Sequence, residues 1–313
     1  MKSRNYAGIS LLASLAACNS ATAETVQKNS TQAPQKPNVI VILADDLGYG
    51  DLKCYGAKNV ETPHVDKLAS EGIRFTNAHT VAATSTPSRY SLLTGEYAWR
   101  RPDTDIAAGD VKMIIRPEQY TMADMFKSAG YATAAIGKWH LGLGDKTGGQ
   151  DWNAPLPAAL GDLGFDYHYI MAATADRVPC VFIENGKVAN YDPSDPIEVS
   201  YTKNFPGEPT GKDNPELLYN LHPSNGHDMS IVNGISRIGF MKGGGKALWK
   251  DENIADSITP FMPSILSNSI KTSLSLCILR PMMYTFPVFL MTASVERILW
   301  DYAETQSPNS TGR

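Results

Sequence analysis

The sequence has few cysteines and little net charge. Its 313 residues include four cysteines, and the formal net charge is -4. The cysteine spacing matches no metal-binding pattern, and it leaves the pairing of Cys54, Cys180 and Cys277 open. A slightly acidic chain gives no indication of nucleic acid as a partner.

Long apolar runs are also lacking. The stretch from Tyr284 to Val295 is too short to span a bilayer, and Arg280 interrupts any longer one. What remains is ordinary for a globular protein, with 42% hydrophobic and 19% charged residues. The length suits one large or two modest domains with a sizeable core.

The first residues have the pattern of an export signal. Lys2 and Arg4 precede a short apolar stretch from Tyr6 to Ala17, which is too short for a membrane-spanning helix. The ending Leu-Ala-Ala-Cys is similar to a bacterial lipobox. That similarity implies cleavage before Cys18 and lipidation of its thiol. We therefore expect residues 1–18 to be a lipoprotein signal peptide.

The residues after this signal predict a flexible tether. Residues 19–37 are rich in Ser, Thr, Gln, Lys and Pro, a composition that does not build a core. The alternative to lipidation is plain secretion, with cleavage after Ala23. Both alternatives predict an exported protein, either periplasmic or an outer-membrane lipoprotein whose only membrane contact is the lipid on Cys18.

An acidic pair follows the first apolar run. Asn38 to Leu43 is a continuous, β-branched run, which predicts a strand buried on both faces of a mostly parallel sheet. Asp45 and Asp46 follow it, where open α/β sheets bind ligands. Adjacent carboxylates repel unless they share a cation, and their oxygens suit Ca²⁺ or Mg²⁺. Without further context, an exposed acidic turn is the simpler interpretation.

The stretch from Ser85 to Gly95 predicts a strand-to-helix turn. Ser85 and Thr86 are good N-caps, Pro87 suits the first turn, and Gly95 ends the helix. A side chain at such a helix start lies among unpaired N–H groups, which favour anions. Arg89 adds planar donors suited to a sulfate or phosphate. On its own, a capped helix with a surface arginine explains this pattern more simply.

A lysine and a histidine follow another strand. A helix over 120–129 is ended by Gly130, and Tyr131 to Ile136 predicts a strand. Lys138 and His140 lie two apart after it, so they share a face if the segment is extended. Facing an anion pocket, they could neutralise ester oxygens and donate a proton to a leaving alkoxide. The simpler alternative is a Gly-rich loop with a solvent-exposed lysine.

In this order and spacing, the three blocks resemble formylglycine-dependent sulfatases of the serine type. Ser-x-Pro-Ser-Arg at Ser85 with the downstream Thr-Gly is similar to the signature whose Cys or Ser is oxidised to formylglycine. Gly-Lys-Trp-His-Leu-Gly from Gly137 is similar to a second family block. The resemblance implies an alkaline-phosphatase-like α/β fold, with a mixed, mostly parallel sheet flanked by helices and with the C-terminal subdomain absent.

The resemblance also implies a mechanism and partners. An aldehyde hydrate at position 85 would attack sulfur, form a covalent sulfate ester and expel sulfate as the aldehyde reforms. Calcium would bind Asp45, Asp46 and the modified Ser85. Arg89, Lys138 and His140 would complete the catalytic group, with Lys138 on the sulfate and His140 on the formylglycine hydroxyl. The implied partners are a sulfated carbohydrate or aryl sulfate and a formylglycine-generating maturase.

The region from Asp151 to Asp256 has weaker periodicity. Residues 181–183 and 187–188 flank Asn185-Gly186, which predicts a hairpin. The loop from Phe205 to His227 is rich in Pro, Gly and Asn, and loops of this kind shape substrate pockets. Its polar residues are candidate substrate contacts: His222, His227 and Asp228.

The sequence changes character from Pro260. Residues 260–290 lack helical or strand periodicity, and the family's later Asn-Asp/His-x-His-x-Pro block, Asp-Asn-Gly block and further lysine are missing. Reading the codons of Arg280 to Pro287 one base earlier allows Ala-Thr-Asn-Asp-Val-His-Val-Pro. The same shift from Asp301 allows another family-like segment. We hypothesise that the reading frame slips near Thr259.

These patterns predict an incomplete sulfatase catalytic region over residues 38–259, followed by an out-of-frame, non-native-like tail over 260–313. The predicted function is hydrolysis of sulfuric esters. One alternative is an inactive truncated remnant or anion-binding lipoprotein, which the missing blocks favour. The other is a phosphonate or phosphodiester hydrolase of the same superfamily, against which the Gly-Lys-Trp-His-Leu-Gly block argues.

Overall fold

The structure is a computed structural model that describes residues 36–219, 222–258 and 274–280, the last of these by the course of the backbone. The predicted signal peptide with Cys18, most of the tether and most of the tail lie outside these ranges and stay predictions. The chain divides into Met1–Lys36 and Pro37–Arg313, and the description below concerns the second unit. No helix in the described ranges is long and apolar enough to cross a membrane.

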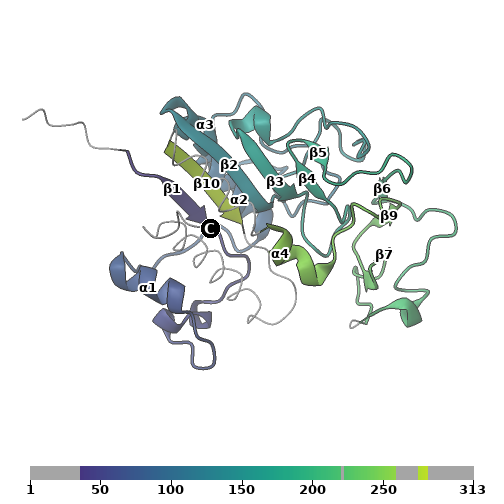
Figure 1. The fold of residues 1–313 in the computed structure, drawn as a ribbon, viewed down its shortest axis with the longest axis horizontal. Helices are drawn as coiled ribbons and strands as arrows, with labels where there is room; N and C mark the ends of the chain where they lie inside the picture. The colour runs from purple at the N-terminus through teal and green to yellow at the C-terminus, as the bar shows by residue number, and fades with distance from the viewer. Residues whose placement is uncertain (1–35, 220–221, 259–273, 281–313) are drawn as a thin grey trace, which may run out of the picture. The chain divides into compact units, whose positions relative to one another are not determined.

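A mixed sheet of six strands organises this unit (Figure 1). Its strand order is β1-β10-β2-β3-β4-β5, with the first four strands parallel and the last two joined antiparallel. A mostly parallel α/β sheet is therefore confirmed. The strands are β1 (Val39–Ile42), β2 (Tyr131–Lys138), β3 (Tyr167–Met171), β4 (Phe182–Glu184), β5 (Lys187–Val188) and β10 (Leu274–Arg280).

The expected hairpin is formed by β4 and β5. Asn185 and Gly186 connect them with φ angles of 47° and 81°. A two-residue turn with both φ angles positive matches the twist of antiparallel strands. The hairpin predicted from the Asn-Gly pair is therefore confirmed, and it forms one edge of the sheet.

Strand β10 lies in the stretch after Pro260, whose sequence lacks helical or strand periodicity. Leu274–Arg280 lies between β1 and β2, parallel to both, with Leu276 opposite Val39 and Thr133. The sequence Leu-Ser-Leu-Cys-Ile-Leu-Arg is a short apolar run. A strand with neighbours on both sides needs no alternation of polar and apolar residues, so a test for periodicity misses it.

Strand β1 differs from its prediction in burial. Its four side chains are half-buried, although a strand buried on both faces was expected. In the described sheet β1 is an edge strand, with a neighbour on one side only. An edge position leaves part of each side chain open, which an apolar run does not reveal.

The helices are short, and α3 packs against β2 of this sheet. They are α1 (Pro63–Glu71), α2 (Ser85–Thr94), α3 (Met122–Ser128) and α4 (Ile254–Ile258). Six 3-10 turns accompany them in the described ranges: Tyr49–Asp51, Lys53–Tyr55, Ala98–Arg100, Leu160–Leu163, Pro215–Leu217 and Asp251–Asn253. Two small antiparallel sheets pair β6 (Glu198–Ser200) with β9 (Phe240–Lys242), and β7 (Ile231–Val232) with β8 (Ile235–Ser236).

Helix α2 begins at Ser85, which is earlier than predicted, because Ser85 and Thr86 were expected to be its N-caps. The cap is Thr84, so Ser85 is the first helical residue and Thr86 the second. Gly95 ends the helix in the left-handed conformation, with φ of 70°. Since the first N–H groups of a helix have no partner within it, Ser85 still lies at a terminus that favours anions.

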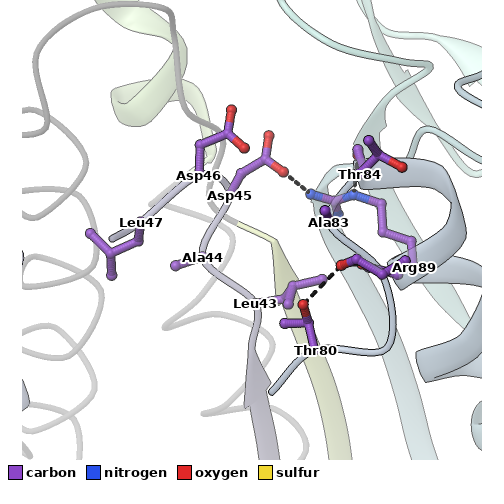
Figure 2. A pocket seen from close by; sticks show the side chains of 12 residues that line it. Leu43, Ala44, Asp45, Asp46, Leu47, Thr80, Ala83, Thr84 and Arg89 are labelled. Carbon is purple, nitrogen blue, oxygen red and sulfur yellow. Dashed lines mark hydrogen bonds and ion pairs between the residues drawn. The ribbon is translucent and has the colours of Figure 1, made fainter. Parts of the chain in front are cut away.

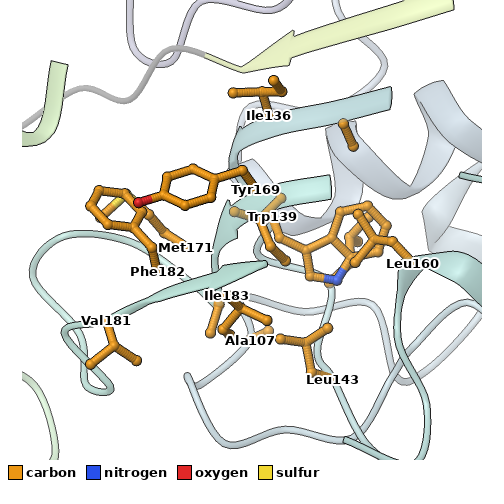
Figure 3. Close-up of a cluster of buried hydrophobic side chains, with 14 of the residues drawn as sticks. Ala107, Ile136, Trp139, Leu143, Leu160, Tyr169, Met171, Val181, Phe182 and Ile183 are labelled. Atoms are coloured by element: carbon orange, nitrogen blue, oxygen red, sulfur yellow. The ribbon is translucent and has the colours of Figure 1, made fainter. Parts of the chain in front are cut away.

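The core anchors the segment that follows β2 (Figure 3). Trp139 is fully buried, donates from Nε1 to the carbonyl of Gly142 at 2.7 Å, and meets Phe165 edge to face. Tyr169 and Phe182 stack across β3 and β4, with ring centroids 4.9 Å apart. Because Trp139 fills the core, the residues on either side of it are held in place.

Candidate active site

Three segments meet at the carboxyl ends of β1 and β2. Asp45 follows β1, Ser85 opens α2 and Lys138 ends β2. Figure 2 shows Asp45 and Asp46 at the end of β1, with Arg89 reaching toward Asp45 from α2. The pocket between them is lined by Leu43, Ala44, Asp45, Asp46, Leu47, Thr80, Ala82, Ala83, Thr84, Ser85, Ser88 and Arg89.

Arg89 lies at the centre of this group and is 1% exposed. Its Nη2 donates to Asp45 Oδ1 at 2.9 Å, its Nη1 to the carbonyl of Lys138 at 3.0 Å, and its Nε to Ser85 Oγ at 2.9 Å. The three contacts use different guanidinium nitrogens, so they fix the plane of the group. The simpler interpretation of a surface arginine is wrong.

Asp45 is held between two cations. Arg89 binds Oδ1, and the Lys138 ammonium forms an ion pair with Oδ2. Burial alone would raise the pKa of Asp45, but the charges of Lys138 and Arg89 outweigh it and lower the pKa. Burial and the nearby Arg89 charge in turn lower the pKa of Lys138 to about 8. Asp45 is therefore a carboxylate at neutral pH, and Lys138 is largely an ammonium.

His140 supplies a neutral imidazole to Ser85. Its Nε2 lies 2.8 Å from the carbonyl of Ala107, and its Nδ1 lies 2.9 Å from Ser85 Oγ. A carbonyl only accepts, so Nε2 carries the proton and Nδ1 accepts the Ser85 hydroxyl. Burial, followed by the charge of Lys138, lowers the pKa of His140 to about 3. The hydroxyl thus donates to a neutral base while it accepts from Arg89.

The sequence analysis missed Thr86 as a positioning residue. Its hydroxyl donates to the carbonyl of His140 at 3.0 Å and accepts from the N–H of Ala107 at 3.1 Å. The side chain thereby ties the start of α2 to both the His140 backbone and the residue that fixes the His140 tautomer. Thr86 stands inside the block identified from the sequence, but its role as an N-cap was wrong.

The pocket carries oxygen donors of the kind that calcium prefers. Asp45, Asp46 and Ser85 present hard oxygen atoms around the same pocket. Calcium takes six to eight oxygen ligands, so these residues supply part of a coordination sphere. Across the described ranges, no three His, Cys, Asp or Glu side chains gather in a metal-binding group. Both oxygens of Asp45 also contact cations of the chain itself.

The three loop candidates have different surroundings. His227 Nε2 lies 2.9 Å from Asp176 Oδ2. His222 is exposed. The backbone carbonyl of Asp228 accepts from the N–H of Lys212 at 2.9 Å. Sequence reasoning missed Asp176 and its neighbour Arg177, whose charge contributes to lowering the pKa of His140. The sequence carries no signal for them, because a contact between distant loops leaves no local pattern.

Comparison with known proteins agrees with this geometry. A family model described as Sulfatase matches residues 37–220. Over 248 residues the chain is 56% identical to the N-acetylgalactosamine-6-O-sulfatase of Bacteroides thetaiotaomicron, an alignment that covers 79% of this chain and 47% of that relative. It is 48% identical over 120 residues to the steryl-sulfatase of Mus musculus, covering 36% of this chain and 19% of the relative. The chain thus spans about half the length of the first relative, and less of the second.

Solved structures give the same result. One from Bacteroides thetaiotaomicron, described under the metabolism of multiple glycosaminoglycans, has a TM-score of 0.82 and 47% identity, covering 87% of this chain and 59% of its own. The structure of Ps i-CgsB with a neocarrahexaose has a TM-score of 0.55 at 22% identity, covering 87% and 55%, which shows a shared fold alone. The mixed sheet flanked by helices is thus the alkaline-phosphatase-like fold, and the chain belongs to the sulfatase family.

Proposed function

We propose that this chain hydrolyses sulfuric esters of carbohydrates, with Ser85 as the residue that is converted to formylglycine. One observation carries the proposal: Ser85 Oγ lies between the Nε of Arg89 and the neutral Nδ1 of His140, at a helix N-terminus. That position combines a proton acceptor with an environment that stabilises an anion. Aryl sulfates would serve as small substrates of the same site.

The similarity to a named relative suggests which sugar to test first. The 56% identical protein is an N-acetylgalactosamine-6-O-sulfatase, so we propose 6-sulfated N-acetylgalactosamine as the first substrate class. An exported enzyme would meet such polymers outside the cytoplasm. Export, a lipid on Cys18 and a formylglycine-generating maturase as partner belong to the same proposal.

The residues divide the chemistry between charge and proton transfer. Arg89 and Lys138 are two buried cations of the site, where they would neutralise sulfate oxygens. His140 is neutral, so it can take the proton of a hydroxyl at position 85 and return it later. Its Ala107 contact holds the imidazole in the tautomer that this requires.

Calcium would be held by Asp45, Asp46 and residue 85. When bound, it would supply positive charge to the sulfate oxygens. We expect calcium to raise the melting temperature of the chain, because a ligand that binds only the folded state stabilises it. Asp46→Asn should remove most of that rise, whereas Asp105→Asn at an exposed position should keep it. An equal rise in all three proteins would contradict calcium at Asp46.

The test of the proposed function combines mass and turnover. The chain is produced together with a maturase, and the Ser85 peptide is examined for the loss of two hydrogens. Release of sulfate from an aryl sulfate and from N-acetylgalactosamine 6-sulfate is then measured. Ser85→Ala should lower turnover to background, while Ser88→Ala in the same helix should keep measurable turnover. Turnover that survives Ser85→Ala would contradict this role of Ser85.

A second candidate is a chain that binds sulfate without turnover. It is favoured by the absence of the second histidine block from the sequence after Thr259. In that case Ser85 stays unmodified and no sulfate is released, although sulfate still binds. Resequencing the gene around Thr259 tests the reading-frame hypothesis separately. A phosphonate or phosphodiester hydrolase is distinguished by turnover of those esters above that of sulfates.

A further inference from the structure

An exposed aromatic surface follows helix α2 and lies outside the active site. Tyr97 and Trp99 are 51% and 73% exposed, and their rings stack with centroids 5.8 Å apart. The guanidinium of Arg100 lies over the Trp99 ring, 5.5 Å from its centroid. We call these three residues the aromatic platform. Single exposed apolar side chains are common on proteins, whereas rings that gather on the surface mark a place for binding.

The backbone under the platform is fixed. Ala98, between the two rings, is 4% exposed, and its N–H donates to Ser91 Oγ at 3.1 Å. Its carbonyl accepts from the hydroxyl of Thr104 at 2.7 Å and from the N–H of Arg101 at 2.9 Å. Because this inner residue is anchored through both of its polar groups, the two outer rings have little backbone freedom. Rings on a fixed backbone lose little entropy when a ligand covers them.

The platform combines apolar ring faces with an available positive charge. Arg100 is exposed, and within the described ranges its guanidinium forms no ion pair. Its neighbour Arg101, in contrast, donates to both carboxylate oxygens of Asp103, at 2.9 and 2.6 Å. A sugar ring has an apolar C–H face that stacks on an aromatic ring, and a guanidinium fits sulfate oxygens. A sulfated sugar therefore satisfies both parts of the platform.

The platform is too small for a stable interface with another protein. Tyr97 and Trp99 together expose on the order of 250 Å². A stable interface takes about 800 Å² from each partner. The next exposed apolar side chain along this loop is Ile106, and the exposed carboxylates of Asp103 and Asp105 precede it. A narrow ligand such as a polysaccharide fits this size, because its sugars contact a protein one ring at a time.

The platform and the active site lie at opposite ends of the same helix. Helix α2 runs from Ser85 to Thr94, a rise of about 15 Å over its ten residues, and the platform begins three residues later. The chain then returns to Ala107, whose N–H donates to Thr86 and whose carbonyl lies against His140. The platform is thus a separate surface, within reach of a ligand several sugars long that also enters the active-site pocket.

We propose that the aromatic platform of Tyr97, Trp99 and Arg100 binds a sulfated polysaccharide at a distance from the ester that is cleaved. The rings stack on sugar faces, and Arg100 pairs with a sulfate of the polymer. The inference rests on the proposed function and extends it from a single sulfated sugar to a polymer. A polymer held at the platform keeps its other sulfates at a high local concentration near the pocket.

The experiment compares a polymer with a single sugar and measures binding, so it does not require turnover. Dissociation constants of the full chain are determined for chondroitin 6-sulfate, a polymer that contains 6-sulfated N-acetylgalactosamine, and for N-acetylgalactosamine 6-sulfate alone. Trp99→Ala should weaken polymer binding about tenfold and leave the affinity for the single sugar within about twofold, because it removes the larger ring of the platform. Tyr120→Ala removes another ring that is 63% exposed and, as the matched control, should change neither affinity.

Arg100→Ala keeps both rings and tests the charge. It should weaken the binding of chondroitin 6-sulfate more than that of unsulfated chondroitin, whereas Trp99→Ala should weaken both. Equal losses for the two polymers in Arg100→Ala would overturn the pairing of Arg100 with sulfate.

Three outcomes would overturn the platform itself. They are an unchanged polymer affinity in Trp99→Ala, the same loss for polymer and single sugar, and a dimer that Trp99→Ala dissociates while polymer affinity stays the same. In the last case the surface binds a second copy of the chain. A chain that binds the single sugar but no polymer overturns the platform alone. A chain that binds neither, and releases no sulfate after maturation, overturns the proposed function as well.

Discussion

The strand-end site and the cluster of Asp176, Arg177 and His227 differ in how deeply their polar groups are buried. At the strand ends, Asp45 and Arg89 are buried, and every contact of Arg89 goes to another part of the site. In the second cluster, Arg177 and His227 both contact the Asp176 carboxylate, and the three side chains are between 18% and 38% exposed. One region is a closed network and the other an open one.

This difference predicts different contributions to stability. A buried charge that loses its partner is costly, whereas a half-exposed ion pair is screened by solvent. The closed network should therefore contribute more to stability than the cluster of Asp176, Arg177 and His227.

The largest expected effect is a difference in the free energy of unfolding between variants that lose one carboxylate in each region. Asp45→Asn leaves Arg89 and Lys138 buried without their counter-charge, so it should lower the free energy of unfolding by about 3–5 kcal/mol. Asp176→Asn removes a partly exposed charge and should cost about 1 kcal/mol or less. Urea unfolding of both variants measures the difference. Similar losses would show that the two regions are not distinct in stability.

Two glycine substitutions test how rigid the backbone of the loop after β2 is. Gly142 has φ of 71°, and a Cβ there would lie 2.0 Å from the carbonyl oxygen of Lys112. Gly130, the residue just before β2, has φ of 86° with open space around it. We expect Gly130→Ala to cost about 1 kcal/mol and Gly142→Ala about 2 kcal/mol more, because the second adds a clash to the strain. Equal costs would mean that the loop relaxes freely.

The contrast also explains what the sequence could predict. Strand β2 and the hairpin after β3 were predictable, and so was the placing of Asp45 and Lys138 together, because each of these residues ends or follows a parallel strand and such strands end at one edge of a sheet. The strand expected before Ser85 is absent, since residues 72–84 form a loop. The partners within the active site required the structure, since no pattern shows that Arg89 reaches Asp45, 44 positions away.

Other features left no usable signal. Strand β10 is a seven-residue apolar run whose neighbours come from much earlier in the chain, so its place between β1 and β2 depends on tertiary pairing. Asp176 meets His227 across 51 positions, and neither lies in a periodic segment. Contacts of this kind are decided by loop packing, which local sequence patterns do not encode.

The smallest expected effect tests whether burial alone keeps an imidazole neutral. His168, in β3, is 3% exposed, and its Nε2 accepts from the N–H of Gly186 at 2.8 Å. Burial lowers the pKa of His168 to about 4, whereas at His140 burial acts together with the charge of Lys138 and gives about 3. His168 therefore isolates the contribution of burial.

The expected pH dependence follows from the sign of this shift. The unfolded chain takes up a proton on His168 below about pH 6.5, while the folded chain does so only near the lowered pKa. The contribution of His168 to stability is therefore complete above pH 6.5 and is lost as the pH falls toward 4. One proton corresponds to about 1.4 kcal/mol per pH unit. We expect His168→Gln, which keeps an acceptor, to reduce the slope of unfolding free energy against pH by about that amount between pH 6 and 5. An unchanged slope would show that His168 is protonated in the folded chain, and the neutrality of His140 would then need its charged neighbours.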